Sequence, residues 1–189
     1  EARLYAEDPE RGFLPSTGTV LALREAAGDG VRVDSALREG LVIPPDYDPM
    51  LAKVIAWGAT RDEALGRLDR ALSETSVLGV RTNTEYLRAL LADPDVRAGR
   101  LDTTLIERRL PELAFRHPDA TLLCAAALWL RPSDGGSGPW HTATGWRTGG
   151  IRVPQRIVVA TSPTDRVDVL VSGDTDTIDD VVHTVRRVS

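Results

Sequence analysis

Lysine and cysteine are nearly absent from this 189-residue chain, and each shortage excludes a kind of chemistry. Cys124 is the only cysteine, so no disulfide can form within the chain, and a reducing compartment such as the cytoplasm is expected. Lys53 is the only lysine among 23 basic residues. A site that holds nucleotide phosphates with several lysines and a glycine-rich lid therefore cannot be built from this chain alone.

A strong net charge, long apolar runs and metal-ligand spacings are also missing. The formal net charge of −5 argues against a nucleic-acid-binding protein, and no apolar run approaches the length of a membrane span. The three histidines show no metal-ligand spacing, so no metal site is predicted. What is present is a composition with 42% hydrophobic residues, enough for a folded chain with a buried core.

The chain opens directly on a strand pattern. Ala2, Leu4 and Ala6 alternate with more polar residues, and Pro9 ends the run. A strand at the start of a chain usually has a neighbour, so we expect this chain to be a piece of a longer protein. Arg3 lies in the middle of the strand and could face whatever the rest of that protein provides.

Residues 1–110 are predicted to form one α+β unit, an antiparallel β-sheet with packed helices. Short strands are predicted at residues 19–23, 31–35 and 41–43 and from about residue 52. These runs are apolar or alternating, and Gly, Asp or Pro separates them. Thr60 begins a capping box for a first helix, and a second helix runs from about Thr84 and stops before Pro94. Asp102 is predicted to cap a short third helix.

The rest of the chain differs in composition. Residues 111–118 are predicted to be a linker, and residues 119–189 a helix followed by a β-rich region. The helix is expected from Asp119 to about Leu130. The β-rich runs lie at residues 157–160, 166–171 and 181–188. Short strands with Gly and Asp turns predict a small partial antiparallel β-barrel, which is incomplete because a closed barrel needs more strands.

Six segments of the first unit follow one another in a distinctive order. They are Glu1-Ala2-Arg3 with Ala6-Glu7-Asp8-Pro9, Phe13-Leu14-Pro15-Ser16, Gly30 to Ser35, Val42-Ile43-Pro44-Pro45, Tyr47-Asp48-Pro49-Met50 with Lys53, and Gly79-Val80-Arg81-Thr82-Asn83. In this order they make residues 1 to 108 similar to the C-terminal domain of biotin carboxylase. The later segment Gly145-Trp146-Arg147-Thr148-Gly149-Gly150 resembles the interdomain, or BT, region of acyl-CoA carboxylase α subunits.

This resemblance implies a ligase in which ATP and bicarbonate are used to carboxylate N1 of biotin. ATP and Mg²⁺ would be bound by the rest of the biotin carboxylase domain, and biotin would be attached to a separate carboxyl carrier domain. A carboxyltransferase β subunit is the implied third partner, and neither nucleic acid nor a membrane is implied. The chain itself would bind none of these cofactors and would be inactive alone.

The resemblance also assigns residues. Arg3 corresponds to the arginine beside bicarbonate and the biotin ureido group, where a permanently charged guanidinium would stabilise negative charge on the ureido oxygen. Asp48 and Lys53 would support the active-site wall. Their alternative is structural, with Asp48 forming a turn and Lys53 pairing with it. Arg32 falls on the face where the family forms subunit contacts, although the nearby Asp29 disfavours an apolar contact there.

Two other hypotheses stay open. Trp140 and Trp146 could anchor a carboxyltransferase partner, which would make the second region an interaction module. Alternatively, the chain could come from a related ATP-grasp ligase such as carbamoyl-phosphate synthase, although such a protein should lack the Phe-Leu-Pro-Ser and Pro-Pro-x-Tyr-Asp segments present here.

Overall fold

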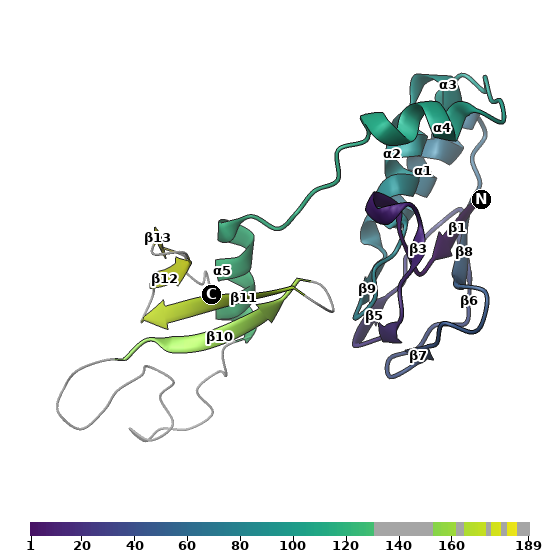
Figure 1. Cartoon of the computed structure of the whole chain (residues 1–189). Coiled ribbons are helices and arrows are strands. Elements are labelled where there is room, and N and C mark those ends of the chain that lie inside the picture. Colours follow the sequence, from purple (N-terminus) through teal and green to yellow (C-terminus); the bar gives the residue numbers. More distant parts are fainter. Residues whose placement is uncertain (131–152, 162–164, 173–174, 179–180, 185–189) are drawn as a thin grey trace. The chain divides into compact units, whose positions relative to one another are not determined.

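The computed structural model describes residues 1–130, 153–161, 165–172, 175–178 and 181–184 (Figure 1). The chain divides into two compact units, Glu1–Phe115 and Arg116–Ser189. The buried residues of the first unit form two clusters, and those of the second unit form one. In the described residues, no helix has both the length and the apolar composition needed to cross a membrane.

The main sheet of the first unit has three antiparallel strands in the order β1-β8-β6 (Figure 1). Strand β1 spans Ala2–Tyr5, β8 spans Met50–Ala56 and β6 spans Val31–Ser35. The predicted alternation of the opening strand is confirmed, since Leu4 is fully buried while its neighbour Arg3 is exposed. Strand β8 begins two residues earlier than the prediction from residue 52.

Three short two-stranded ladders complete the β structure of the first unit. They pair β2 (Glu7–Asp8) with β3 (Leu14–Pro15), β4 (Gly18–Thr19) with β7 (Val42–Ile43), and β5 (Ala22–Arg24) with β9 (Ser76–Leu78). A 3-10 turn, η1 (Pro9–Arg11), lies between β2 and β3. The strand predicted at residues 19–23 is divided, because the amide of Val20 bonds Leu41 whereas that of Leu21 bonds Leu78.

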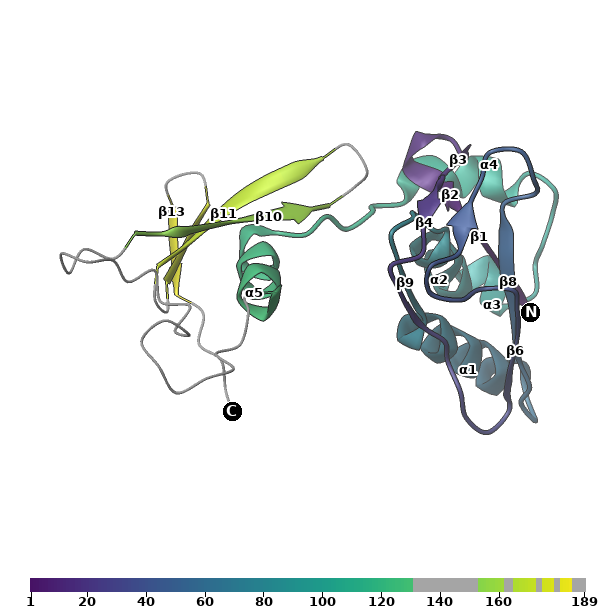
Figure 2. The same cartoon turned by 90° about the horizontal axis from the view of Figure 1, so that it is seen from below.

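Two amphipathic helices cover the sheet (Figure 2). Helix α1 (Arg61–Glu74) lies against β8 and β6, and α2 (Thr84–Ala92) lies against α1 and β1. The predicted capping box is confirmed: the Glu63 amide donates to Thr60 Oγ1 at 3.2 Å. The Glu63 carboxylate in turn accepts from the Ala59 amide at 2.8 Å. Helix α1 buries Leu68, Ala71 and Leu72, whereas α2 buries Tyr86 and packs Leu87 and Leu91 only in part. Helix α2 ends before Pro94, as predicted.

One short helix, between the second predicted helix and the one predicted after Asp102, was not predicted. Helix α3 (Pro94–Arg97) begins at the proline that ends the prediction for the preceding helix, because the fixed φ of proline suits the first position of a new helix. Asp93 caps it by accepting from the amides of Asp95 and Val96 at 2.7 and 3.3 Å. Helix α4 (Leu105–Arg109) and the 3-10 turn η2 (Leu110–Glu112) follow.

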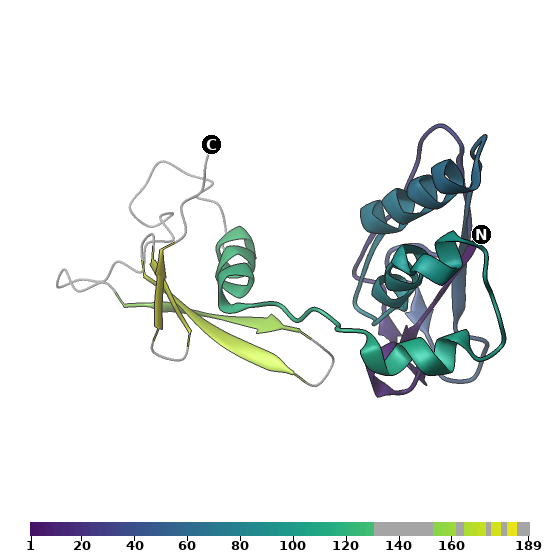
Figure 3. The ribbon, with the colours of Figure 1, turned by 90° about the horizontal axis from the view of Figure 1, so that it is seen from above.

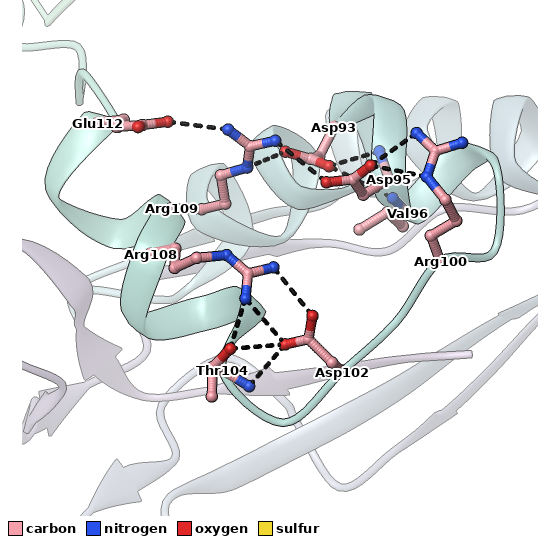
Figure 4. Close-up of polar contacts among 9 residues, drawn as sticks. All are labelled: Asp93, Asp95, Val96, Arg100, Asp102, Thr104, Arg108, Arg109 and Glu112. Atoms are coloured by element: carbon pink, nitrogen blue, oxygen red, sulfur yellow. Dashed lines mark hydrogen bonds and ion pairs between the residues drawn. The ribbon is translucent and has the colours of Figure 1, made fainter.

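Arginine side chains tie these segments into one structure, which we call the α3–α4 corner (residues 93–112, Figure 4). Arg109 lies within 3.3 Å of three carboxylates, those of Asp93, Asp95 and Glu112. Its Nε is 2.8 Å from Asp93 but off the direction that a hydrogen bond requires, so this contact is an ion pair. Arg108 donates to Asp102 at 3.0 and 3.2 Å.

The second unit packs one helix on an open sheet (Figure 3). Helix α5 (Ala120–Leu130) lies against strands β10 (Gln155–Ala160) and β11 (Arg166–Ser172). Cys124 and Val169 are fully buried where helix and sheet meet. Strands β12 (Thr175–Ile178) and β13 (Val181–Thr184) extend the sheet in the order β10-β11-β12-β13.

The α+β class with antiparallel sheets is confirmed, but the partial barrel is not. Within the described residues the four strands form an open sheet, in which β10 and β13 are the two outer strands. Strand β12 was not among the predicted β-rich runs, because its Asp and Thr residues hide the pattern of a strand. In the structure its backbone pairs with β11 and with β13.

Candidate functional site

Arg3 projects from the exposed face of the three-stranded sheet. Its neighbours Ala2 and Leu4 are buried on the other face, which fixes the strand, while 59% of the Arg3 side chain is exposed. Arg3 lies opposite Lys53 of β8, and Lys53 lies opposite Asp34 of β6. The sheet therefore places three charged residues in one row across its strands.

Electrostatics keep the arginine charged and leave it accessible. Arg3 Nε donates to Glu1 Oε1 at 3.0 Å, and this bond raises the pKa of Arg3, with a second contribution from Tyr5. The same bond lowers the pKa of Glu1, to which the charge of Lys53 also contributes. Because the pair is exposed to solvent, it contributes little to stability. A substrate anion could replace Glu1 at little cost.

Asp48 lies two residues before the first residue of strand β8. Its Oδ1 accepts a hydrogen bond from the Met50 amide at 2.9 Å, which is the turn geometry that aspartate favours before a strand. Among the described residues no ion pair is found between Asp48 and Lys53, and the strand register places Lys53 between Arg3 and Asp34. Burial, and then the charge of Asp48, raise the pKa of Glu7.

Arg32 lies on β6, the outer strand of the sheet. Its guanidinium pairs with Asp34 at 3.1 Å, and 71% of the side chain is exposed. Arg32 lies opposite Ile55, two residue pairs along the ladder from the pair of Asp34 and Lys53. A contact between subunits through this strand remains a proposal.

The structure brings together sequence segments whose residues were not assigned a role. The Arg81 amide donates to Ser16 Oγ at 2.9 Å, and the Arg81 guanidinium lies 3.5 Å from the buried Asp8. Asn83 is buried and contacts the backbone of β1. The sequence marks these residues only through the order of the six segments, and Asn83 was interpreted simply as the residue before a helix.

One predicted site, the partner-docking site, falls on residues that the structure does not describe. Trp140 and Trp146 lie outside the described residues. In the part of the chain that the structure describes, no group of three or more His, Cys, Asp or Glu side chains could hold a metal ion.

Comparison with known proteins gives the family. Residues 1–108 match the family model of the biotin carboxylase C-terminal domain, and residues 118–188 match that of the BT domain of the methylcrotonyl-CoA carboxylase α subunit. The first match covers more than half of the chain, and the chain therefore belongs to the biotin carboxylase C-terminal domain family.

Individual relatives agree with this assignment. The biotin carboxylase of Pseudomonas aeruginosa is 44% identical over 110 residues, which are 58% of this chain and 24% of that protein. The mitochondrial methylcrotonoyl-CoA carboxylase subunit alpha of Dictyostelium discoideum is 34% identical over 158 residues, 78% of this chain and 23% of that protein. The chain thus spans less than a quarter of the length of these relatives.

Among solved structures, the biotin carboxylase domain of the Hydrogenobacter thermophilus 2-oxoglutarate carboxylase is similar. It was solved in complex with MgADP, ADP and bicarbonate. The TM-score is 0.60 at 34% identity, and the alignment covers 61% of this chain and 26% of that one.

Proposed function

We propose that this chain is the C-terminal region of biotin carboxylase within the α subunit of a biotin-dependent acyl-CoA carboxylase. In that setting it forms one wall of the site in which biotin N1 is carboxylated at the expense of ATP, with bicarbonate as the carbon source. The observation that carries the proposal is Arg3, an exposed guanidinium on a strand with buried neighbours, whose one carboxylate partner within 4 Å is the exposed Glu1 just before the strand.

Carboxylation of biotin N1 needs a permanently charged cation such as the Arg3 guanidinium. Loss of the proton from biotin N1 leaves negative charge on the ureido oxygen, and a guanidinium stabilises that charge without giving up its own proton. The raised pKa of Arg3 fits this role, because the side chain stays charged throughout. Lys53, directly opposite on β8, adds positive charge to the same face, and Asp48 sets where β8 begins.

The other components come from outside the chain. ATP and Mg²⁺ are bound by the remaining part of the biotin carboxylase domain, and biotin arrives on a carrier domain. The separate chain is therefore inactive, and bicarbonate-dependent ATP hydrolysis by the purified chain would contradict this. The matched family model is that of biotin carboxylase, which argues against the carbamoyl-phosphate synthase alternative.

The second unit has a separate role in the proposal. Its match to the BT domain of a carboxylase α subunit supports docking of a carboxyltransferase β subunit, with Trp140 and Trp146 as anchors. We also propose a reducing compartment, the cytoplasm, because Cys124 is the only cysteine of the sequence and its side chain is buried.

Replacement of Arg3 tests the proposal. In a carboxylase that carries this chain, Arg3→Ala should lower kcat for carboxylation of free biotin by about 10²-fold, the usual cost of removing one charge-stabilising donor. ATP binding should not change. Arg156→Ala is the matched control, because Arg156 is also an exposed strand arginine paired with one carboxylate, at 2.6 Å from Asp168. Equal activities of the two variants would overturn the proposed role of Arg3.

A further inference from the structure

We propose that Asn83 is the positioning residue for Arg3: its side-chain amide holds the backbone of β1 at the residues on both sides of Leu4. This inference rests on the proposed function of Arg3. It concerns a residue that does not touch the substrate and acts only through the strand that carries the arginine.

Asn83 makes hydrogen bonds to the backbone of β1 that a neighbouring strand would otherwise make. Asn83 Oδ1 accepts from the Tyr5 amide at 2.9 Å, and Nδ2 donates to the Arg3 carbonyl at 3.2 Å. The Asn83 amide also donates to the Tyr5 carbonyl at 3.2 Å. Because β1 is an outer strand of its sheet, these backbone groups need partners other than β8. One residue supplies all three hydrogen bonds.

Asparagine suits this position for a chemical reason. Its terminal amide carries both an acceptor and a donor, as a backbone peptide group does. Aspartate has the same shape but, when ionised, cannot donate to the Arg3 carbonyl. Asn83 is only 5% exposed, so a side chain without these groups would leave buried backbone atoms unsatisfied.

The Asn83 side chain does not cap the helix that follows it. Asn83 precedes the first residue of α2, where asparagine normally accepts a bond from an amide of the helix's own first turn. No such capping bond forms here, and the amide contacts β1 instead. The α2 helix still fixes the position of Asn83, because the Leu87 amide bonds its carbonyl at 2.9 Å.

The segment leading to Asn83 is fixed as well. Gly79 has φ +105°, and a Cβ there would lie 1.9 Å from the carbonyl oxygen of Thr19. Only glycine permits this close approach. Next, the Arg81 amide is held by Ser16. Asn83 therefore reaches β1 from a segment that is anchored on both sides.

The consequence for Arg3 follows from its own contacts. Its side chain is largely exposed and meets only residues of its own strand, Glu1 and Tyr5, so it does not fix its own direction. Its backbone is held by pairing with β8 on one side and by Asn83 on the other. Loss of the Asn83 amide should let β1 shift, and the guanidinium with it. A shift of about 1 Å in a catalytic group can cost about 10²-fold in rate.

The test uses a carboxylase that carries this chain, with Asn83→Ala and the equal-sized Asn83→Asp. Thr75→Val is the matched control, because Thr75 is also buried and its hydroxyl donates to a backbone carbonyl, that of Ala71 at 2.9 Å, away from β1. Hydrogen exchange at the Tyr5 amide, kcat for biotin carboxylation and ATP binding are measured for each variant.

We expect Tyr5 exchange at least about tenfold faster in both Asn83 variants and unchanged in the control. Carboxylation should fall at least about tenfold in both variants, with ATP binding unchanged. In the Arg3→Ala background, Asn83→Ala should have almost no further effect on kcat, because the group that it positions is gone.

Three results would overturn the inference. Full activity of Asn83→Asp would mean that the residue acts by shape alone. An equal loss of activity in Thr75→Val would reduce Asn83 to a general contribution to stability. Additive losses in the double variant would show that Asn83 does not act through Arg3, while the role of Arg3 itself would stand. Only unchanged activity of Arg3→Ala would overturn the proposed function, and this inference with it.

Discussion

The sheet face that carries Arg3 and the α3–α4 corner both depend on arginine, but they use it differently. Arg3 has one carboxylate partner within 4 Å, Glu1, and 59% of its side chain is exposed. Arg109 has three such partners, and 32% of its side chain is exposed. Several carboxylates around one guanidinium leave no room for a ligand, whereas a single exposed carboxylate can be displaced. The number of partners thus separates an arginine that stabilises the fold from one that is available for chemistry.

The largest expected effect on stability comes from Asp93. Its carboxylate caps α3 and pairs with Arg109, and it is only 10% exposed. Asp93→Ala should lower the free energy of unfolding of the first unit by about 2 kcal/mol, because α3 loses its cap and the partly exposed Arg109 guanidinium loses one of its three carboxylate partners. Urea unfolding followed through hydrogen exchange of first-unit amides measures this.

Asp34→Ala is the control for that change. Asp34 pairs with Arg32 at 3.1 Å but is 48% exposed and lies on the sheet face. Its loss should cost less than about 0.5 kcal/mol. Equal losses for the two aspartates would remove the distinction between the corner and the sheet face.

Acidification should weaken the corner. Hydrogen bonds from Arg108 lower the pKa of Asp102, and a hydrogen bond from Arg100 lowers the pKa of Asp95. A carboxyl group with a lowered pKa in the folded state stabilises the fold above its unfolded pKa of about 4, and this stabilisation disappears as the pH falls through the folded pKa. The unfolding midpoint should therefore fall as the pH is lowered from about 5 toward 2.

Asp102→Asn shows whether the corner causes this pH dependence. The variant cannot ionise at residue 102, so its unfolding midpoint should change less with pH than that of the unaltered chain. Two parallel pH profiles would show that the Arg108–Asp102 contact contributes nothing measurable.

The sequence predicted the elements better than it predicted their connections. Alternation around Leu4 and the spacing of Leu68, Ala71 and Leu72 predict a strand and a helix, because burial of one face leaves a period in the sequence. The Asn83 contact leaves no such signal, since it joins residues about 80 positions apart through one amide. Helix α3 was missed because Pro94 both ends one helix and begins another.

For the candidate site, too, the sequence predicted single elements but not the contacts between them. The family resemblance assigned Arg3, and the strand pattern correctly predicted that it lies between buried neighbours. That Lys53 lies directly opposite Arg3 depends on the register of β1 and β8, which the separate sequences of the two strands do not contain. Like charges directly opposite each other destabilise a sheet, so Glu1 and Asp34 beside this pair offset a cost that becomes visible only in the structure.

The smallest expected effect on stability belongs to Glu1. Because the Glu1–Arg3 pair is exposed, Glu1→Gln should leave the unfolding midpoint of the first unit unchanged. In a carboxylase that carries this chain, the variant should keep full carboxylation of biotin, since Glu1 only occupies the guanidinium until a substrate replaces it. Steady-state kinetics with free biotin, alongside Arg3→Ala, decide the point. A loss as large as that of Arg3→Ala would mean that Arg3 needs its carboxylate partner, and the contrast with Arg109 would no longer hold.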